Sequence, residues 1–215
     1  MKIVIFTIND SIYIPRLLNP ILTDSNLKIE HIFISKTFFS FKKFKRNLKF
    51  FISNKYPFCI SFRDLILFSI EKTKIKFENL FFPNCKNNLQ MFLKSKGSKY
   101  SYVDKVNDEK FLEKLRTLNP DIVLFAIFDK VVSSEFINIA NIGTFNLHLG
   151  PLPTFKGGLS AFWLLRFNNK YAGTSIHKVI EKIDEGELIE ETKFLIKTNS
   201  MKELLIESID KSSKL

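Results

Sequence analysis

The stretch Ile122-Val123-Leu124-Phe125-Ala126-Ile127-Phe128 decides the fold class of this 215-residue chain. All seven residues are apolar, and Pro120-Asp121 and Asp129 bound the run on its two sides. A run that is this short and has no polar face is typical of a parallel strand buried on both faces of its sheet. We therefore expect a central parallel strand with helices above and below it.

Strand-like and helical segments alternate on both sides of this run. Further strands are expected at 2–7, 29–34, 144–149, 174–180 and 188–196. Helices are expected after Asn9 or Asp10, over 87–96 up to Gly97, from Asn107 or Asp108 to Leu118, beginning near Phe162 and Trp163, and over 201–215. This alternation predicts an α/β domain with a mostly parallel sheet and helices on both faces.

The N-terminal half of the chain lacks the glycines that phosphate-binding loops require. The first glycine is Gly97. A dinucleotide-binding fold needs glycines directly after its first strand, and a phosphate loop needs them before a Lys-Ser or Lys-Thr pair. These two common classes of α/β protein are therefore excluded.

The composition favours a single domain over residues 1–215. Hydrophobic residues make up 45% of the chain, and no Gly/Ser-rich or Pro-rich linker divides it. Because the chain has only two cysteines and no secretory signal, we expect it in the cytoplasm. Two cysteines and three histidines are too few ligands for a structural metal site. The longest uncharged stretch, 136–155, contains Asn, His and Pro and is too polar to span a bilayer.

The net charge of +11 is concentrated in a Phe-rich segment at about 36–98, where 14 Lys or Arg face three acidic residues. Apolar residues at helical spacing over 41–52 and 62–70 predict a helical insertion. Three interpretations stay open: helices packed on the sheet, which we favour, a membrane-surface element, or a nucleic-acid surface. No nucleic-acid partner is expected, because the segment carries no recognisable binding motif.

Six of the seven glycines and two of the three histidines lie between 143 and 186. Within this region Asn146 and His148 are two residues apart on a predicted strand, so their side chains face the same way. An amide donor beside an imidazole suits acyl transfer, because both can stabilise the oxygen that becomes negative in a tetrahedral intermediate. His148 can also take a proton from an attacking amine, and Asp184 is the available carboxylate to orient it.

Two other polar residues of this region, His177 and Lys156, each have two possible interpretations. His177 is either a strand residue hydrogen-bonded within the sheet or a member of the pocket. Lys156 either binds an anionic group of a ligand or is a solvated loop lysine.

The region resembles the formyltransferase family that includes methionyl-tRNA, glycinamide-ribonucleotide and nucleotide-sugar formyltransferases. The matching elements, in order, are Asn146-x-His148, Leu152-Pro153, Phe155-Lys156-Gly157, Thr174 with His177, and Asp184-Glu185-Gly186. Two positions depart from the family pattern. Gly150 stands where a Ser is usual, and Pro151 stands where a Leu is usual.

The resemblance implies a Rossmann-like formyltransferase fold and 10-formyltetrahydrofolate as the formyl donor. It implies Asn146, His148 and Asp184 as the catalytic trio and no metal. It also implies folate-binding positions at Phe128, Pro153, Gly157 and Gly186.

The acceptor is expected to be the primary amine of a nucleotide-linked amino sugar, because the 157–163 stretch is most similar to the sugar-modifying branch. Glycinamide ribonucleotide is an alternative, although its branch has a glycine-rich phosphate site after the first strand. Methionyl-tRNA is another, although its enzymes carry a C-terminal barrel that the chain up to Leu215 does not show. A non-catalytic basic binding protein on the same fold, a homodimer and a peripheral membrane contact also stay open.

Overall fold

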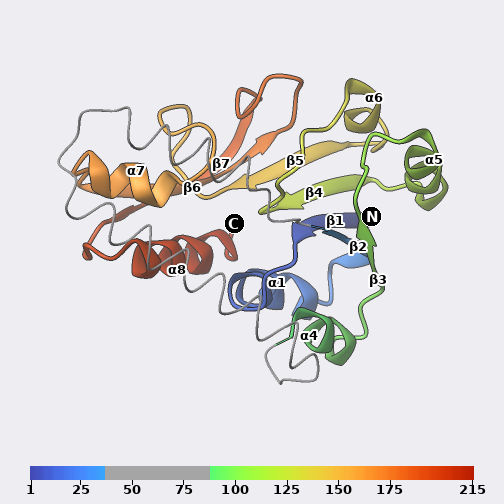
Figure 1. Ribbon diagram of the computed structural model, residues 1–215, viewed down its shortest axis with the longest axis horizontal. Helices are drawn as coiled ribbons and strands as arrows, with labels where there is room; N and C mark the ends of the chain where they lie inside the picture. Colours follow the sequence, from blue (N-terminus) through green and yellow to red (C-terminus); the bar gives the residue numbers. More distant parts are fainter. Residues whose placement is uncertain (37–87) are drawn as a thin grey trace.

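The computed structural model describes residues 1–36 and 88–215, and its elements alternate along the chain as the sequence predicts (Figure 1). The strands are β1 (Lys2–Ile8), β2 (Lys28–Ser35), β3 (Tyr100–Val103), β4 (Ile122–Ala126), β5 (Gly143–His148), β6 (Tyr171–Lys178) and β7 (Leu188–Leu195). The helices are α1 (Tyr13–Thr23), α4 (Leu89–Ser95), α5 (Glu109–Leu118), α6 (Ser134–Ile137), α7 (Ser160–Arg166) and α8 (Met201–Ser212).

The seven strands form one sheet in the order β3-β2-β1-β4-β5-β6-β7. The first five strands in this order, from β3 to β5, pair in parallel. Strand β6 pairs antiparallel with β5, and β7 pairs antiparallel with β6. The expected mostly parallel sheet is confirmed, and the run that begins at Ile122 is its central strand.

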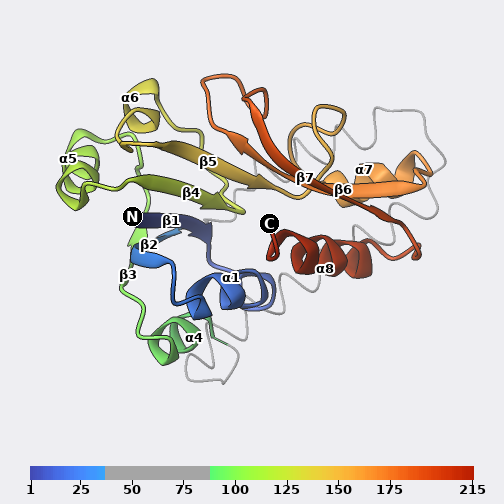
Figure 2. The same ribbon diagram turned by 180° about the vertical axis from the view of Figure 1, so that it is seen from behind.

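Helices cover both faces of the sheet because β1 is apolar on both of its sides. Ile3 and Ile5 pack in a cluster with residues of α1, α4 and α8. Val4 and Phe6 point the opposite way and pack with residues of α5 and α6. Figures 1 and 2 show α1, α4 and α8 on one side of the sheet and α5 and α6 on the other.

The second face is rich in aromatic rings. The Phe6 ring has its centroid 5.0 Å from that of Phe33 and 5.2 Å from that of Phe136. Such offset and edge-on pairs add stabilisation beyond the area that the rings bury. Part of the high Phe content of the chain therefore serves this core.

Helix ends follow the expected capping chemistry. Asp108 caps α5 by accepting a hydrogen bond from the Lys110 N–H, and Asn119 ends the same helix in the left-handed conformation at φ 45°. Asp10 lies just before α1 and accepts hydrogen bonds from the amide of Ile12, which precedes the helix, and from that of Tyr13, its first residue. Asp108 is one of the two caps expected for α5, whereas the N-cap of α1 is Ile12 and not the expected Asn9 or Asp10.

Two elements were not expected from the sequence, and one is shorter than expected. The edge strand β3 and the one-turn helix α6 were missed. Strand β4 ends at Ala126 rather than at Phe128, because Ile127 adopts φ 58° and leaves the extended conformation.

Much of the basic segment is not described. The helices expected over 41–52 and 62–70 lie outside the described residues, so the three interpretations of the segment stay open. No helix among the described residues is long and apolar enough to cross a membrane.

Candidate active site

A cavity of about 700 Å³ opens at the carboxyl ends of β1, β4 and β5, on the edge where ligands bind in open α/β sheets. Strand β5 contributes Asn146 and His148 to its lining, and the β6–β7 connection contributes Asp184. A volume of this size is typical of a small-molecule site. The three residues expected to form the catalytic trio therefore line one cavity.

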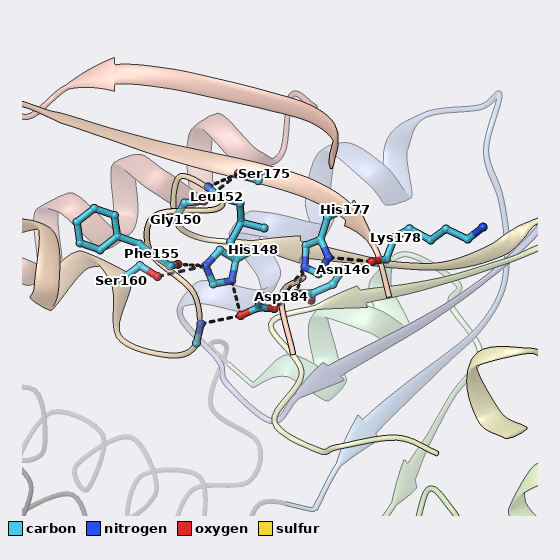
Figure 3. Close-up of polar contacts among 11 residues, drawn as sticks. Asn146, His148, Gly150, Leu152, Phe155, Ser160, Ser175, His177, Lys178 and Asp184 are labelled. Atoms are coloured by element: carbon cyan, nitrogen blue, oxygen red, sulfur yellow. Dashed lines mark hydrogen bonds and ion pairs between the residues drawn. The ribbon is translucent and has the colours of Figure 1, made fainter. Parts of the chain in front are cut away.

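Asn146 and His148 point to the same side of β5, as their spacing predicts (Figure 3). His148 is only 7% exposed. Its Nε2 lies 2.7 Å from the carbonyl oxygen of Phe155 and 3.5 Å from the Ser160 hydroxyl. Because a carbonyl only accepts, Nε2 carries a hydrogen in this arrangement.

The other ring nitrogen of His148 faces a carboxylate. Nδ1 lies 3.6 Å from Asp184 Oδ2. A proton taken up at Nδ1 would give an imidazolium with an acceptor on each side, Asp184 at Nδ1 and the Phe155 carbonyl at Nε2. Each ring nitrogen of His148 therefore faces an oxygen atom that can accept a hydrogen bond.

Asp184 sits at the centre of the polar cluster (Figure 3). It adopts φ 53° in the connection between β6 and β7, a left-handed conformation that Asp tolerates better than most residues. Its Oδ2 accepts a 2.7 Å hydrogen bond from the Gly157 N–H, and its Oδ1 lies 3.3 Å from His177 Nε2. The loop that follows β5 and the turn that follows β6 thus meet at this carboxylate.

The pKa of Asp184 lies below its usual value. Burial raises this pKa, but the hydrogen bond with His177, the positive charge that His148 carries when protonated, and the Gly157 N–H together outweigh burial. Asp184 is therefore held as an acceptor of hydrogen bonds rather than as an acid.

His177 belongs both to the sheet and to the cavity. It lies directly opposite Asn146 in the β5–β6 pairing and is 2% exposed. Its Nδ1 donates to the Lys178 carbonyl over 3.0 Å, and its Nε2 lies 3.0 Å from the Asn146 side-chain nitrogen. Both readings of this residue therefore apply, since it lines the cavity as well.

The four expected folate-binding positions divide into two pairs. Phe128 and Gly157 are among the residues that line the cavity, whereas Pro153 and Gly186 are not. Gly186 packs so tightly that an added Cβ would lie 1.7 Å from the Lys178 carbonyl oxygen. Folate contact at all four positions stays a prediction, and for Gly186 the close approach is a sufficient structural reason for glycine.

Several residues that line the cavity were not singled out from the sequence as site residues. Asp10 follows β1 and Asp129 follows β4, and both contribute to the lining. A usable signal was present, because polar residues just after parallel strands gather at the same edge of the sheet. Among the described residues, no group of three or more His, Cys, Asp or Glu side chains is placed to hold a metal ion.

Lys156 lies on the rim of this region. Its Nζ is 3.1 Å from Glu185 Oε1, and both side chains are 41% exposed. The pair joins the glycine-containing loop to the turn that carries Asp184, beside the Gly157–Asp184 hydrogen bond. In this structure Lys156 is therefore a paired loop lysine.

Comparison with known proteins agrees with this geometry. A family profile described as "Formyl transferase" matches residues 82–214, which is more than half of the chain. The bifunctional polymyxin resistance protein ArnA of Wigglesworthia glossinidia brevipalpis is 31% identical over 112 residues, which are 52% of this chain and 16% of the relative. Methionyl-tRNA formyltransferase of Thermodesulfovibrio yellowstonii is 30% identical over 123 residues, which are 52% of this chain and 40% of the relative.

Solved structures share the fold at low sequence identity. Glycinamide ribonucleotide transformylase 1 from Symbiobacterium toebii is 12% identical with a TM-score of 0.67, covering all of this chain and 83% of that one. The sugar 3N-formyl transferase WlaRD is 15% identical with a TM-score of 0.56, covering all of this chain and 59% of that one.

The matches to the curated relatives span well under half of the length of those proteins. The family profile nevertheless covers β3 to α8, and with them Asn146, His148 and Asp184. The chain belongs to the formyl transferase family.

Proposed function

We propose that this protein transfers a formyl group from 10-formyltetrahydrofolate to a primary amine. The observation that carries the proposal is the convergence of Asn146, His148 and Asp184 in one cavity at the ends of parallel strands. A positioned amide, an imidazole and a carboxylate are the groups that transfer of an acyl group to an amine requires.

Each member of the trio has a distinct role in this proposal. The Asn146 amide donates a hydrogen bond to the oxygen on which negative charge develops. His148 accepts the proton of the attacking amine at Nδ1. Asp184, 3.6 Å from that nitrogen, stabilises the imidazolium and orients the ring.

The cavity suits a folate. Its lining joins apolar side chains, among them Phe125, Phe128 and Leu147, to the polar cluster at Asn146 and His148. A flat ring system with polar edges fits such a site. We propose that Phe128 and Gly157 hold the donor from the cavity side, where it supplies the formyl group, and that Pro153 and Gly186 shape the loops around it.

For the acceptor we propose the amine of a nucleotide-linked amino sugar. The proposal is supported by the lack of glycines after β1, where glycinamide-ribonucleotide enzymes place a phosphate site, and by the likeness to a sugar 3N-formyl transferase. Glycinamide ribonucleotide and methionyl-tRNA are the alternatives, since relatives and structural neighbours bear these names.

The test is formyl transfer by the purified full chain with 10-formyltetrahydrofolate and a panel of acceptors. The panel contains nucleotide-linked amino sugars, glycinamide ribonucleotide and methionyl-tRNA, and the product is identified by the mass gain of one formyl group. We expect transfer to an amino-sugar nucleotide and none by His148→Ala, with His31→Gln as a control outside the cavity. Folate binding without transfer to any amine would instead support a non-catalytic binding protein.

A further inference from the structure

The side chain of Ser160 and the backbone of Gly150 meet beside the imidazole of His148 (Figure 3). Ser160 is the first residue of α7 and is only 6% exposed, and its Oγ lies 3.5 Å from His148 Nε2. A Cβ on Gly150 would lie 2.6 Å from the Ser160 Oγ, 2.8 Å from the Ser160 Cβ and 3.0 Å from His148 Nε2. Ser160 and the edge of the imidazole therefore occupy the space that a side chain at position 150 would need.

The backbone on both sides of this contact is held in place. The carbonyl oxygen of Gly150 accepts a 2.9 Å hydrogen bond from the Ser175 hydroxyl. Ser175 is fully buried and lies directly opposite His148 in the β5–β6 pairing. The start of α7 is fixed as well, because its buried apolar residues pack with residues of β6, β7 and α8. The contact between Ser160 and the ring of His148 is therefore built into the fold.

The contact concerns the ring nitrogen of His148 that does not face Asp184. A neutral imidazole carries one hydrogen, and the Phe155 carbonyl oxygen, 2.7 Å from Nε2, can only accept it. The Ser160 hydroxyl adds a second, more distant oxygen at Nε2 that can also accept. Both oxygens favour the tautomer with its hydrogen on Nε2, which leaves Nδ1 free to take up a proton.

We propose that Ser160 is a positioning residue of the reaction, which holds the ring of His148 and its tautomer from the space that Gly150 leaves open. This inference rests on the proposed formyl transfer, in which Nδ1 of His148 accepts the proton of the amine. Ser160 acts through His148 and takes no part in the proton transfer itself. The same contact gives a reason for Gly150, which departs from the family pattern, because a serine at this position would compete with Ser160 for one space.

The first test removes the hydroxyl alone. Ser160→Ala deletes only the hydroxyl oxygen, so the fold is kept. Ser208→Ala is the matched control, because Ser208 is a buried serine of α8 that bonds to the Leu204 carbonyl and does not line the cavity. We expect kcat to fall roughly three- to tenfold in Ser160→Ala with a smaller change in KM, because the ring is less often in its productive orientation. Equal kcat values in Ser160→Ala and Ser208→Ala would overturn the proposal.

A second readout follows the ring itself and does not require formyl transfer. Nitrogen NMR of the histidine rings reports which nitrogen carries the hydrogen, and the chain has three histidines, so His148 is identified by the signals lost in His148→Gln. We expect the hydrogen on Nε2 in the wild-type protein and in Ser208→Ala, and a larger share of the Nδ1–H tautomer in Ser160→Ala. A tautomer balance that is the same in all three proteins would overturn the proposal.

A third test separates the hydroxyl from the volume that it fills. Gly150→Ala is expected to displace Ser160 or the ring and to lower kcat at least as much as Ser160→Ala does. Adding Ser160→Gly removes both Ser160 atoms that the new Cβ would meet at 2.6 and 2.8 Å. We expect Gly150→Ser with Ser160→Gly to recover more kcat than Gly150→Ala with Ser160→Gly, because only the former returns a hydroxyl to the vicinity of Nε2.

Equal recovery in the two double variants would mean that only volume matters at this contact, and it would overturn the role of the hydroxyl. The ring measurement also keeps this inference separate from the proposed activity. If the wild-type protein transfers no formyl group while the tautomer of His148 shifts in Ser160→Ala as expected, the proposed activity alone is wrong and the hold of Ser160 on the ring is supported.

Discussion

Asn146 is held by two neighbours, and this arrangement fixes the direction of its amide. Its Nδ2 lies 3.0 Å from His177 Nε2 and 3.4 Å from Asp184 Oδ1. Because Asp184 Oδ1 lies 3.3 Å from His177 Nε2 and also accepts from the amide, the ring, the carboxylate and the amide form one hydrogen-bonded network. The amide is therefore preorganised before any substrate arrives, which is the condition for electrostatic stabilisation of a developing charge.

The first prediction concerns this amide and the imidazole beside it. Asn146→Ala is expected to lower kcat by roughly 10²–10³-fold, as the loss of one preorganised donor does in comparable sites. His148→Ala is expected to leave no measurable transfer, because the proton acceptor is lost. Steady-state kinetics with the accepted amine measure both effects. Near wild-type kcat in both variants would contradict the proposed mechanism.

A second prediction separates positioning from catalysis at His177. We expect His177→Gln to reduce kcat by roughly tenfold with a smaller change in KM, because Asn146 loses the ring nitrogen that orients it. In the double variant with Asn146→Ala, the additional loss should be near zero, since the two residues act as a unit. If the two losses instead multiply, His177 acts independently of Asn146.

The sequence predicts the relative orientation of two side chains where both residues lie on one strand. Asn146 and His148 had to share a side because both lie on one strand. Contact between Asp184 and His148 depends on how β6 turns back along β5, which no local pattern encodes. Asp10 was expected only as a candidate helix cap, and its place in the cavity wall follows from the strand order β1-β4-β5.

The β6–β7 connection is the element on which the site depends most. It carries Asp184 at φ 53° and passes so close to β6 that Gly186 leaves no room for a side chain. The antiparallel return of β6 brings His177 opposite Asn146, so one connection places two cavity residues. Its geometry is therefore part of the proposed catalytic arrangement.

A third prediction follows for this connection. Gly186→Ala would place a Cβ 1.7 Å from the Lys178 carbonyl oxygen, which forces the turn away from β6. We expect a loss of roughly 1–3 kcal/mol in the free energy of unfolding and reduced transfer, because Asp184 moves with the turn. Urea unfolding measures the first effect. Gly158→Ala is the control, since its Cβ would meet nothing within 4 Å and its stability should change by less than about 0.5 kcal/mol.

At the scale of elements, the misses have local physical causes. Strand β3 is only four residues long, Tyr100–Val103, and lies at the edge of the sheet, so it lacks the apolar run that marks a buried strand. Helix α6 is a single turn capped by Ser133, too short for helical periodicity to show. The sequence did not indicate that β4 ends at Ala126, because the apolar run continues through Ile127 to Phe128.

Across the whole molecule, the two-sided burial of the sheet fixes the cavity at one edge. The cluster around Ile5 and the cluster around Phe6 hold the parallel strands from opposite faces, and their carboxyl ends share the same edge. The sequence predicts this arrangement, because apolar runs without a polar face require cover on both sides. The sequence does not predict that β6 and β7 are antiparallel, because their residue patterns do not indicate the direction of a strand.

The last prediction concerns the pH dependence of global stability. The pKa of Asp184 is lower in the folded protein than the ordinary value of about 3.9 in an unfolded chain. The fold therefore gains stability from the ionised carboxylate above that ordinary value, and the gain is lost as the pH falls through the folded-state pKa. His31 acts in a different window, because burial and then Lys114 and Lys99 lower its pKa. The folded state thus binds the His31 proton more weakly than the unfolded chain, and stability declines as the pH falls below about 6.5.

Comparison with Asp184→Asn separates the two contributions, since both proteins keep His31. The measurement is the midpoint of urea unfolding for the two proteins from pH 3 to pH 8. Asparagine tolerates the left-handed conformation of position 184, so backbone strain stays the same in the variant. We expect the wild-type advantage to be largest above pH 5 and to shrink as the pH falls below about 4. An advantage that does not change with pH would mean that the carboxylate gains nothing from ionisation in the fold, and the role of Asp184 as a stabiliser of imidazolium would lose its electrostatic basis.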